Sequence, residues 1–304
     1  MKYLKLYSND ESYMTDKPNL GDLWVACTQS ENNVYYSSEI SNSLCFTALE
    51  DNASVQIRLN DFEFMYGYNP AGWQDKSFYY KKNNDVEWTN WIFEDIATSK
   101  IILNKGEKLY VMSDSYNSCF SYDDLTASTK YYYFNINEGK ISASGNIMSL
   151  LNFTPILPNY AFNQLFLNCT SLVSAPKLPA TTLSDYCYGD MFRSCTSLTQ
   201  VPELPATTLA HSCYSYMFAY CSSLTQAPEL PATTLVDNCY KEMFNNCTKL
   251  NYIKALFTTT PSSACTNAWV NNVSPTGTFV KSKDATWTET GSNGIPEGWT
   301  VTTV

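Results

Sequence analysis

The sequence is short of basic residues, with 19 lysines and arginines against 29 aspartates and glutamates and a formal net charge of −10 at pH 7. Proteins that bind nucleic acid or anionic membranes need a basic face to neutralise phosphate groups. The composition therefore predicts that neither is a partner. Long apolar runs are also missing, since none approaches the ~18 residues of a membrane-spanning helix, so no membrane span is expected.

Histidine is almost absent, and the motifs of common metal and cofactor chemistry are missing. His211 is the only histidine, and the sequence contains neither a CxxC pair nor a glycine-rich phosphate loop. Carboxylates are plentiful, but no segment places two of them in the distinctive setting of a glycosidase pair. We therefore predict no catalytic residues, no metal site and no cofactor, and we expect that the protein is not an enzyme.

A secretory signal is not recognisable in residues 1–14, which contain no apolar core of about 7–15 residues and no small-residue cleavage site. The protein is therefore expected to stay where it is made or to leave the cell by another route. Host-cell lysis is one such route, and it releases virion proteins that have no signal.

The dominant feature is a phrase that recurs every 26 residues. It begins LPATTL at Leu178, Leu204 and Leu230, and each copy continues through MF to a cysteine. A fixed period of 20–50 residues is the signature of a stacked repeat, so the sequence predicts a solenoid.

Each repeat is predicted to contain one helix and one extended segment. Leu183, Cys187, Met191 and Cys195 recur at intervals of four residues, which indicates one apolar face of a helix. Leu198, Val201 and Leu204 then indicate a short extended strand, which Pro202 and Pro205 interrupt. Neighbouring repeats must then cover the apolar interior.

Eight of the 11 cysteines follow the same period and are expected to be buried free thiols. Helices of adjacent coils would pack about 8–10 Å apart, beyond the ~7 Å between Cα atoms that a disulfide tolerates. The two series are Cys169, Cys195, Cys221 and Cys247, and Cys187, Cys213, Cys239 and Cys265.

The rest of the chain divides into three further segments. Residues 1–42 contain short strand patterns around a polar run and are expected to be a docking or anchor segment. Residues 43–147 are rich in β-branched and aromatic runs separated by turn residues, which predicts an all-β sandwich or jelly roll. Within it, the aromatic stretch 65–88 is either a binding loop or a packed hairpin. Residues 277–304 are expected to form a β cap on the repeats of residues 148–276.

The phrase MFxxCTSLTxAPELPATTL resembles the cysteine-containing, BspA-like class of leucine-rich repeat that is common in gut Bacteroidetes. The likeness extends from about Phe162 to Gly298. The opening segment, MKYLK with VACTQSENNVYYSS, resembles leaders of proteins from phages and prophages of the same bacteria. The resemblance implies a surface adhesion or recognition protein and carries over no catalytic residues. The expected fold class is thus α+β: an N-terminal β-sandwich or jelly roll, then a leucine-rich-repeat solenoid with a β cap.

Three hypotheses of function follow. The first is a virion component of a tailed phage, a head or tail fibre or attachment subunit, which docks on other virion proteins through residues 1–42. It would bind a host surface protein or glycan, and it is expected to be a homo-oligomer by analogy with other fibres. The second is a bacterial cell-surface adhesin. The third is a carbohydrate-active enzyme, which glycan binding without turnover would exclude.

Candidate binding residues lie where the repeats differ from one another. Tyr216 and Tyr220 occupy outer positions of the middle repeat, where exposed aromatic side chains suit contact with a sugar or a protein. Tyr188, Tyr214 and Tyr240 recur with the period and are instead expected to pack between repeats. The variable outer positions include Asp185, His211 and Asp237, and also Arg193, Ala219 and Asn245.

Overall fold

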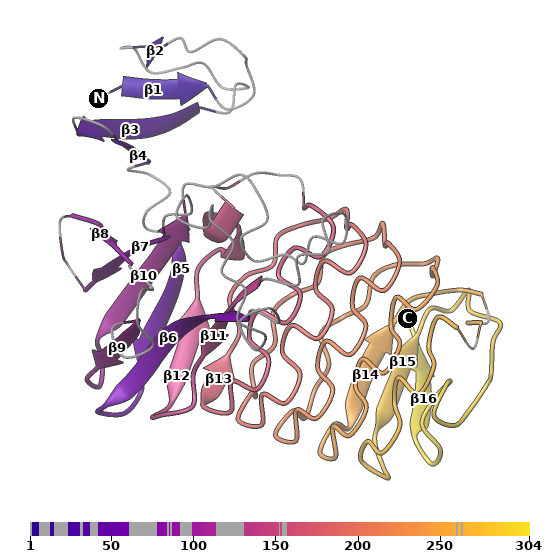
Figure 1. Ribbon diagram of the computed structural model, residues 1–304. Helices are drawn as coiled ribbons and strands as arrows, with labels where there is room; N and C mark the ends of the chain where they lie inside the picture. Colours follow the sequence, from indigo (N-terminus) through magenta and orange to yellow (C-terminus); the bar gives the residue numbers. More distant parts are fainter. Residues whose placement is uncertain are drawn as a thin grey trace, which may run out of the picture. The chain divides into compact units, whose positions relative to one another are not determined.

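Figure 1 shows the computed structural model of the protein. The described part forms two compact units, Met1–Ser43 and Leu44–Val304. The structure describes residues 2–5, 13–14, 24–30, 33–36, 42–60, 78–83, 85, 87–91, 99–113, 131–151, 153, 157–259, 261–262 and 264–304.

The first unit contains a four-stranded antiparallel sheet in the order β2-β1-β3-β4. The short strand patterns predicted within residues 1–42 are confirmed. The strands are β1 (Lys2–Lys5), β2 (Tyr13–Met14), β3 (Trp24–Ser30) and β4 (Asn33–Tyr36). The docking role of this segment remains a prediction.

The second unit begins with two sheets. The larger has the order β13-β12-β5-β10-β7-β8 and the smaller the order β11-β6-β9. The larger sheet comprises β5 (Leu44–Ala48), β7 (Phe78–Lys82), β8 (Thr89–Asn90), β10 (Lys108–Ser113), β12 (Ile141–Ser144) and β13 (Leu172–Ser174). The smaller comprises β6 (Ala53–Asn60), β9 (Lys100–Leu103) and β11 (Tyr131–Asn135). Part of the stretch 65–88 is therefore strand β7, and residues 65–77 lie outside the described part.

Aromatic side chains join the two sheets into one core. Phe46 of β5 meets Phe134 of β11 edge to face, with 5.0 Å between ring centroids, and Phe78 of β7 meets Tyr132 of β11 at the same separation. Edge-to-face pairs of this kind add about 0.5–1.5 kcal/mol to simple area burial. Phe134 also stacks on Phe166 at 5.3 Å, so the core continues directly into the repeats.

The sheet crosses the position at which the repeats were expected to begin. β12 pairs in parallel with β13, which belongs to the first repeat. Between them lies a short 3-10 helix, η4 (Ile147–Leu151), with every side chain buried. The larger sheet and the first repeat are therefore parts of one structural layer.

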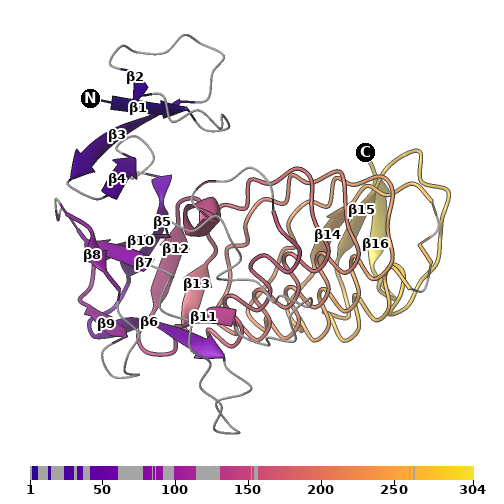
Figure 2. The ribbon, with the colours of Figure 1, turned by 45° about the horizontal axis from the view of Figure 1, so that its top comes forward.

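Successive repeats lie side by side in a regular row (Figure 2). Equivalent aromatic rings stack from one repeat to the next, with nearly parallel planes. The phenylalanine column runs Phe166, Phe192, Phe218 and Phe244, with centroid separations of 5.3, 5.6 and 5.9 Å. The tyrosine column runs Tyr188, Tyr214 and Tyr240, at 5.9 and 6.1 Å, which confirms that these tyrosines pack between repeats.

Residues 184–195 and their equivalents at intervals of 26 form overlapping turns, which we call the turn ribbon. Its N–H groups alternate between two kinds of partner. The N–H of Tyr188 donates to the carbonyl of Cys213 in the next repeat, at 3.0 Å, whereas that of Gly189 donates to the carbonyl of Tyr186, at 3.1 Å. Each repeat is thus tied to its neighbour at every second residue.

The backbone of the turn ribbon is left-handed at every fourth residue. The φ angles are 58° at Tyr186, 53° at Asp190 and 61° at Ser194. An α-helix has uniformly negative φ and bonds each N–H to the carbonyl four residues back. The helix predicted for each repeat is therefore wrong.

The predicted fold class is wrong with it. The described residues are nearly all β and turns, η4 is the one regular helix among them, and no sheet there is closed. The α+β class, with a sandwich or jelly roll followed by a leucine-rich-repeat solenoid of helix-plus-strand coils, does not describe this chain. No helix in the described part is long and apolar enough to cross a membrane.

The end of the chain forms a parallel sheet in the order β14-β15-β16. Its strands are β14 (Tyr252–Ala255), β15 (Thr278–Lys281) and β16 (Thr300–Thr303). Trp269, which is fully buried, stacks on Tyr240 at 6.2 Å between centroids and terminates the tyrosine column. Its indole N–H donates to the carbonyl of Gly294 at 2.8 Å, so residues of the last segment hold it in place.

The cysteines of the repeats are buried and free, as predicted, but the spacing argument behind that prediction was wrong. Adjacent repeats are joined by direct main-chain hydrogen bonds, so they are closer than two packed helices. The thiols of one series instead have hydrogen-bond partners of their own: the Sγ of Cys221 donates to the carbonyl of Phe192 at 3.1 Å. The same bond recurs from Cys169 to Phe134, Cys195 to Phe166 and Cys247 to Phe218.

Candidate binding surface

The turn ribbon alternates two inward and two outward side chains. Cys187 and Tyr188 point inward and are almost fully buried, and the same holds four residues later for Met191 and Phe192. Asp190, Arg193 and Ser194 stay partly exposed between them. The outward positions of neighbouring repeats therefore lie next to one another and form a continuous surface. The prediction that Ala219 and Asn245 are outer positions is wrong, because Ala219 is fully buried and Asn245 is only 7% exposed.

Tyr216 is the best-held side chain on this surface. Its hydroxyl donates to Oε1 of Glu242 at 2.7 Å. The guanidinium of Arg193 lies 5.3 Å and the ammonium of Lys241 5.6 Å from the ring centroid, within the range of cation–π attraction. Arg193 also pairs with Asp190 at 3.0 Å. Three side chains from the two flanking repeats thus hold Tyr216 in place.

Tyr220 lies beside this group and is 42% exposed. Arg193 approaches its ring as well, at 5.7 Å from the centroid. Tyr220 is one of five large apolar side chains that the described residues leave exposed, and the other four are Leu49, Ile102, Val301 and Val304. It is the aromatic one.

A row of asparagine amides extends the surface toward the chain end. Asn245 donates to Oε2 of Glu242 at 2.7 Å, and Asn271 donates in turn to the side-chain oxygen of Asn245 at 3.1 Å. Asn272 makes the equivalent bond to Asn246 at 2.7 Å. We call the whole group the tyrosine–asparagine surface: Asp190, Arg193, Tyr216, Tyr220, Lys241, Glu242, Asn245, Asn246, Asn271 and Asn272.

The electrostatics of this surface favour a fixed, neutral arrangement. Partial burial and the hydrogen bond to Glu242 raise the pKa of Tyr216 to about 12, so its hydroxyl stays protonated and keeps donating. Burial raises the pKa of Asp190, and Arg193 opposes that rise. The formal charges of the two cations, Arg193 and Lys241, balance those of the two carboxylates, Asp190 and Glu242. The surface is thus pre-organised for aromatic contact and for hydrogen bonding through amides.

The remaining predicted residues lie one turn earlier in the ribbon. The main-chain N–H of His211 donates to Oδ1 of Asp185 at 3.0 Å, and Nε2 of His211 lies 3.0 Å from the hydroxyl of Tyr186. Tyr186 stacks on Tyr160, with 4.6 Å between centroids. Asp237 is exposed one repeat further on, and its main-chain carbonyl accepts a hydrogen bond from Ser212. The structure thus brings Asp185 and His211 together.

Sequence reasoning missed two of the aromatic residues and most of the amides. Tyr160 and Tyr186 are exactly one repeat apart, which is a signal that could have found them. The link from Tyr216 to Glu242 also spans one repeat. Spacing alone could not identify that link, because the conformation of the ribbon decides which side chains of neighbouring repeats face each other.

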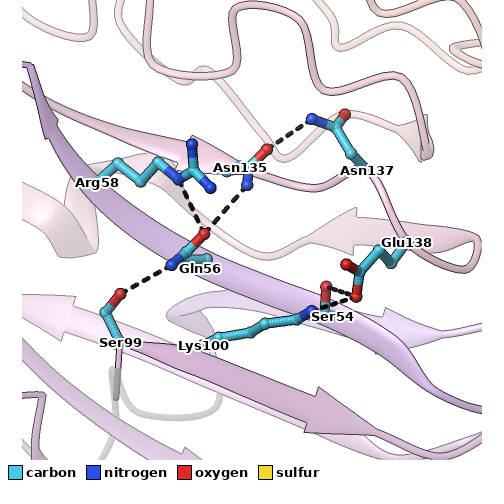
Figure 3. Close-up of polar contacts among 8 residues, drawn as sticks. All are labelled: Ser54, Gln56, Arg58, Ser99, Lys100, Asn135, Asn137 and Glu138. Carbon is cyan, nitrogen blue, oxygen red and sulfur yellow. Dashed lines mark hydrogen bonds and ion pairs between the residues drawn. The ribbon is translucent and has the colours of Figure 1, made fainter. Parts of the chain in front are cut away.

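A second polar cluster lies on the smaller sheet (Figure 3). Gln56 of β6 is 4% exposed, donates to Oγ of Ser99 at 3.1 Å, and accepts from Arg58 at 2.9 Å and Asn135 at 3.1 Å. These bonds use three of the four hydrogen-bonding positions of the amide. The cluster links β11, β6 and the start of β9, so we assign it to holding their register.

A separate polar group on the same sheet contains an ion pair between Lys100 and Glu138. The hydrogen bonds from Lys100 and then Ser54 lower the pKa of Glu138, which therefore stays ionised near neutral pH. In the part of the chain that the structure describes, no group of three or more histidine, cysteine, aspartate or glutamate side chains is placed to hold a metal ion.

The tyrosine–asparagine surface is the most developed outward-facing group among the described residues. Its side chains come from consecutive repeats, and direct contacts connect them from Asp190 to Asn272. Comparisons with known proteins add no constraint on what it binds: no family model, no curated protein and no solved structure matches the chain.

Proposed function

We propose that the protein is a non-catalytic recognition protein that binds its partner through the tyrosine–asparagine surface. The observation that carries this proposal is the exposed Tyr220 beside the fixed ring of Tyr216, with Arg193 against both. Tyrosine and arginine are enriched among the residues that dominate binding energy at protein interfaces. A side chain already held in place also loses little conformational entropy when a partner binds.

A protein partner fits this surface better than a glycan does. Sugars stack on open aromatic faces, whereas Arg193 and Lys241 both lie against the ring of Tyr216. The balanced charge, the amides and the exposed tyrosine resemble the composition of protein–protein interfaces. A glycan remains an outcome that the binding experiment below distinguishes.

We further propose that the protein works as a virion component of a tailed phage, as a head or tail fibre or attachment subunit. Two sequence likenesses support this: the BspA-like repeat phrase of surface-recognition proteins, and the phage-like opening of the chain. The unit Met1–Ser43 would then dock on other virion proteins, and the assembled subunit would be a homo-oligomer. The adhesin alternative is supported by the repeat phrase alone.

Binding of the purified protein to intact Bacteroidetes cells tests the recognition role. Tyr220→Ala should reduce binding by roughly tenfold or more, because hot-spot tyrosines contribute 2 kcal/mol or more. Ile102→Ala is the matched control, since Ile102 is 43% exposed on β9, outside the surface. Equal binding by both variants would contradict the proposal. Binding that survives protease treatment of the cells but not glycosidase treatment would identify a glycan.

Mass spectrometry of purified phage particles tests the virion role. The proposal predicts peptides of this chain at a fixed ratio to the major capsid protein. Their absence from particles, together with their presence on the bacterial surface, would favour the adhesin alternative.

A further inference from the structure

A groove lies on another part of the repeats, between residues 199–205 of one repeat and residues 226–231 of the next. Its volume is about 540 Å³, within the range of ligand-binding sites. Two prolines of each repeat line it: Pro202 and Pro205, and Pro228 and Pro231. None of these residues belongs to the tyrosine–asparagine surface, so the groove is a separate feature.

The ladder of main-chain hydrogen bonds between repeats is interrupted at this groove. One repeat further on, the N–H of Ala227 donates to the carbonyl of Tyr252 and that of Leu230 to Lys254, both at 2.9 Å. The equivalent donors one repeat earlier are Val201 and Leu204. Both groove segments are described throughout, and no main-chain hydrogen bond joins one to the other.

The interruption gives the groove the character of a sheet edge. Because prolines supply no N–H, only a few main-chain N–H groups of residues 199–205 can donate hydrogen bonds to a ligand. An extended peptide bonds to such an edge through its own main chain, and pockets beside the edge select its side chains. The apolar rings of the prolines provide surface for those side chains.

The charge in the groove selects the kind of peptide. Glu203 and Glu229 both line it. The carboxylate of Glu229 is paired with Lys254 at 2.9 Å, whereas Glu203 has no ion pair within the described part of the chain. The equivalent position one repeat earlier is a lysine, Lys177, so this carboxylate distinguishes the groove from its neighbour.

We propose that the groove binds an extended peptide segment that carries a lysine or arginine. The peptide main chain accepts hydrogen bonds from the N–H groups of Val201 and Leu204. Its cation lies against the carboxylate of Glu203. This site is independent of the proposed contact surface and adds a second, linear-motif partner to it.

Peptide titration of the full-length protein tests this proposal. The probes are two capped peptides, TVKVT and TVEVT, followed by fluorescence anisotropy and by amide chemical shifts of residues 201–204 and 227–230. TVKVT should shift these amides and bind at least fivefold more tightly than TVEVT. Glu203→Lys should reverse that preference. Replacing the central peptide bond by an ester, whose carbonyl is a weaker acceptor, should weaken binding severalfold, because it weakens the bonds from the groove N–H groups.

Glu297→Lys is the matched control, since it makes the same charge change at an exposed position outside the groove. It should leave the preference for TVKVT unchanged. The proposal is overturned if TVKVT shifts none of the groove amides at about 1 mM. It is also overturned if Glu203→Lys and Glu297→Lys change the preference equally, which would assign it to net charge alone.

Discussion

The ring of Phe218 shows how single residues stabilise the repeats. It is fully buried, and it stacks on Phe192 on one side and on Phe244 on the other. Removing a central ring would leave a cavity whose two aromatic walls belong to different repeats. Because both walls are also tied by main-chain hydrogen bonds, they cannot move together to close it.

Phe218→Ala should therefore lower the free energy of unfolding by about 3–5 kcal/mol, measured by urea denaturation. Tyr220→Ala, two residues away and 42% exposed, is the control and should cost less than about 1 kcal/mol. If Phe218→Ala lowered the free energy of unfolding by less than ~1 kcal/mol, the stacked column of phenylalanines would not be a main source of stability.

At this scale the sequence was informative about which side chains are buried. The recurrence of tyrosine, phenylalanine and cysteine at one period placed them inside, where the structure has them. The contacts of Tyr216 were out of reach, because Glu242 and Lys241 face it only through the conformation of the ribbon.

The geometry of the turn ribbon explains why the sequence predicted a helix in each repeat. From Cys187 to Cys195, a helix of 3.6 residues per turn rotates only about 80° away from a strict four-residue repeat. An apolar helix face is at least about 100° wide, so it would hold all three inward positions. The strands, in contrast, were predicted from β-branched and aromatic runs between turn residues. Composition therefore identified strands, whereas periodicity misidentified the ribbon.

Glycine substitution separates the ribbon from a helix. Ser194→Gly should be neutral or stabilising by up to about 1 kcal/mol, because its φ of 61° costs an ordinary residue energy that glycine avoids. Ala219→Gly, at a buried ribbon position outside the left-handed set, should destabilise by about 1 kcal/mol. Thermal unfolding of both variants measures this difference. In a helix both substitutions would cost about 1 kcal/mol. Equal losses of stability would therefore contradict the left-handed conformation at Ser194.

The whole second unit depends on thiols and phenols that must stay neutral. Burial raises the pKa of Cys169, Cys187 and Cys247 from 9.0 to about 12, and it also raises the pKa of Cys195 and Cys221 well above 9.0. In the unfolded chain these thiols lose their protons near pH 9. Above that pH the unfolded state binds fewer protons than the folded state, so the stability of the fold declines as pH rises.

The free energy of unfolding should consequently be flat near neutral pH and decline steeply between about pH 9 and pH 12. Each buried thiol contributes up to about 1.4 kcal/mol per pH unit in that range. Cys221→Ala should make the slope shallower by about one proton, whereas Leu224→Ala, a control at a fully buried position without a titrating group, should leave the slope unchanged. Urea denaturation across this pH range measures both slopes. If Cys221→Ala left the slope unchanged, the pH dependence could not be attributed to the buried thiols.

At the scale of the whole molecule, the sequence indicated repeats of 26 residues but not how they join the preceding sheets. The pairing of β12 with β13 and the contact of Phe134 with Phe166 connect segments that composition alone had separated. Such contacts depend on register between distant segments, which a single sequence does not encode in any local pattern.

The interchangeable geometry of the repeats also has a genetic consequence. Because each repeat presents the same inward side chains and the same hydrogen-bonding pattern to the next, a whole unit can be gained or lost without altering the joints that remain. Near-identical stretches such as LPATTL are the kind of template on which unequal recombination acts. A lineage carrying this gene could thereby lengthen its row of repeats and exchange its outward residues in a single event, leaving the folded interior untouched.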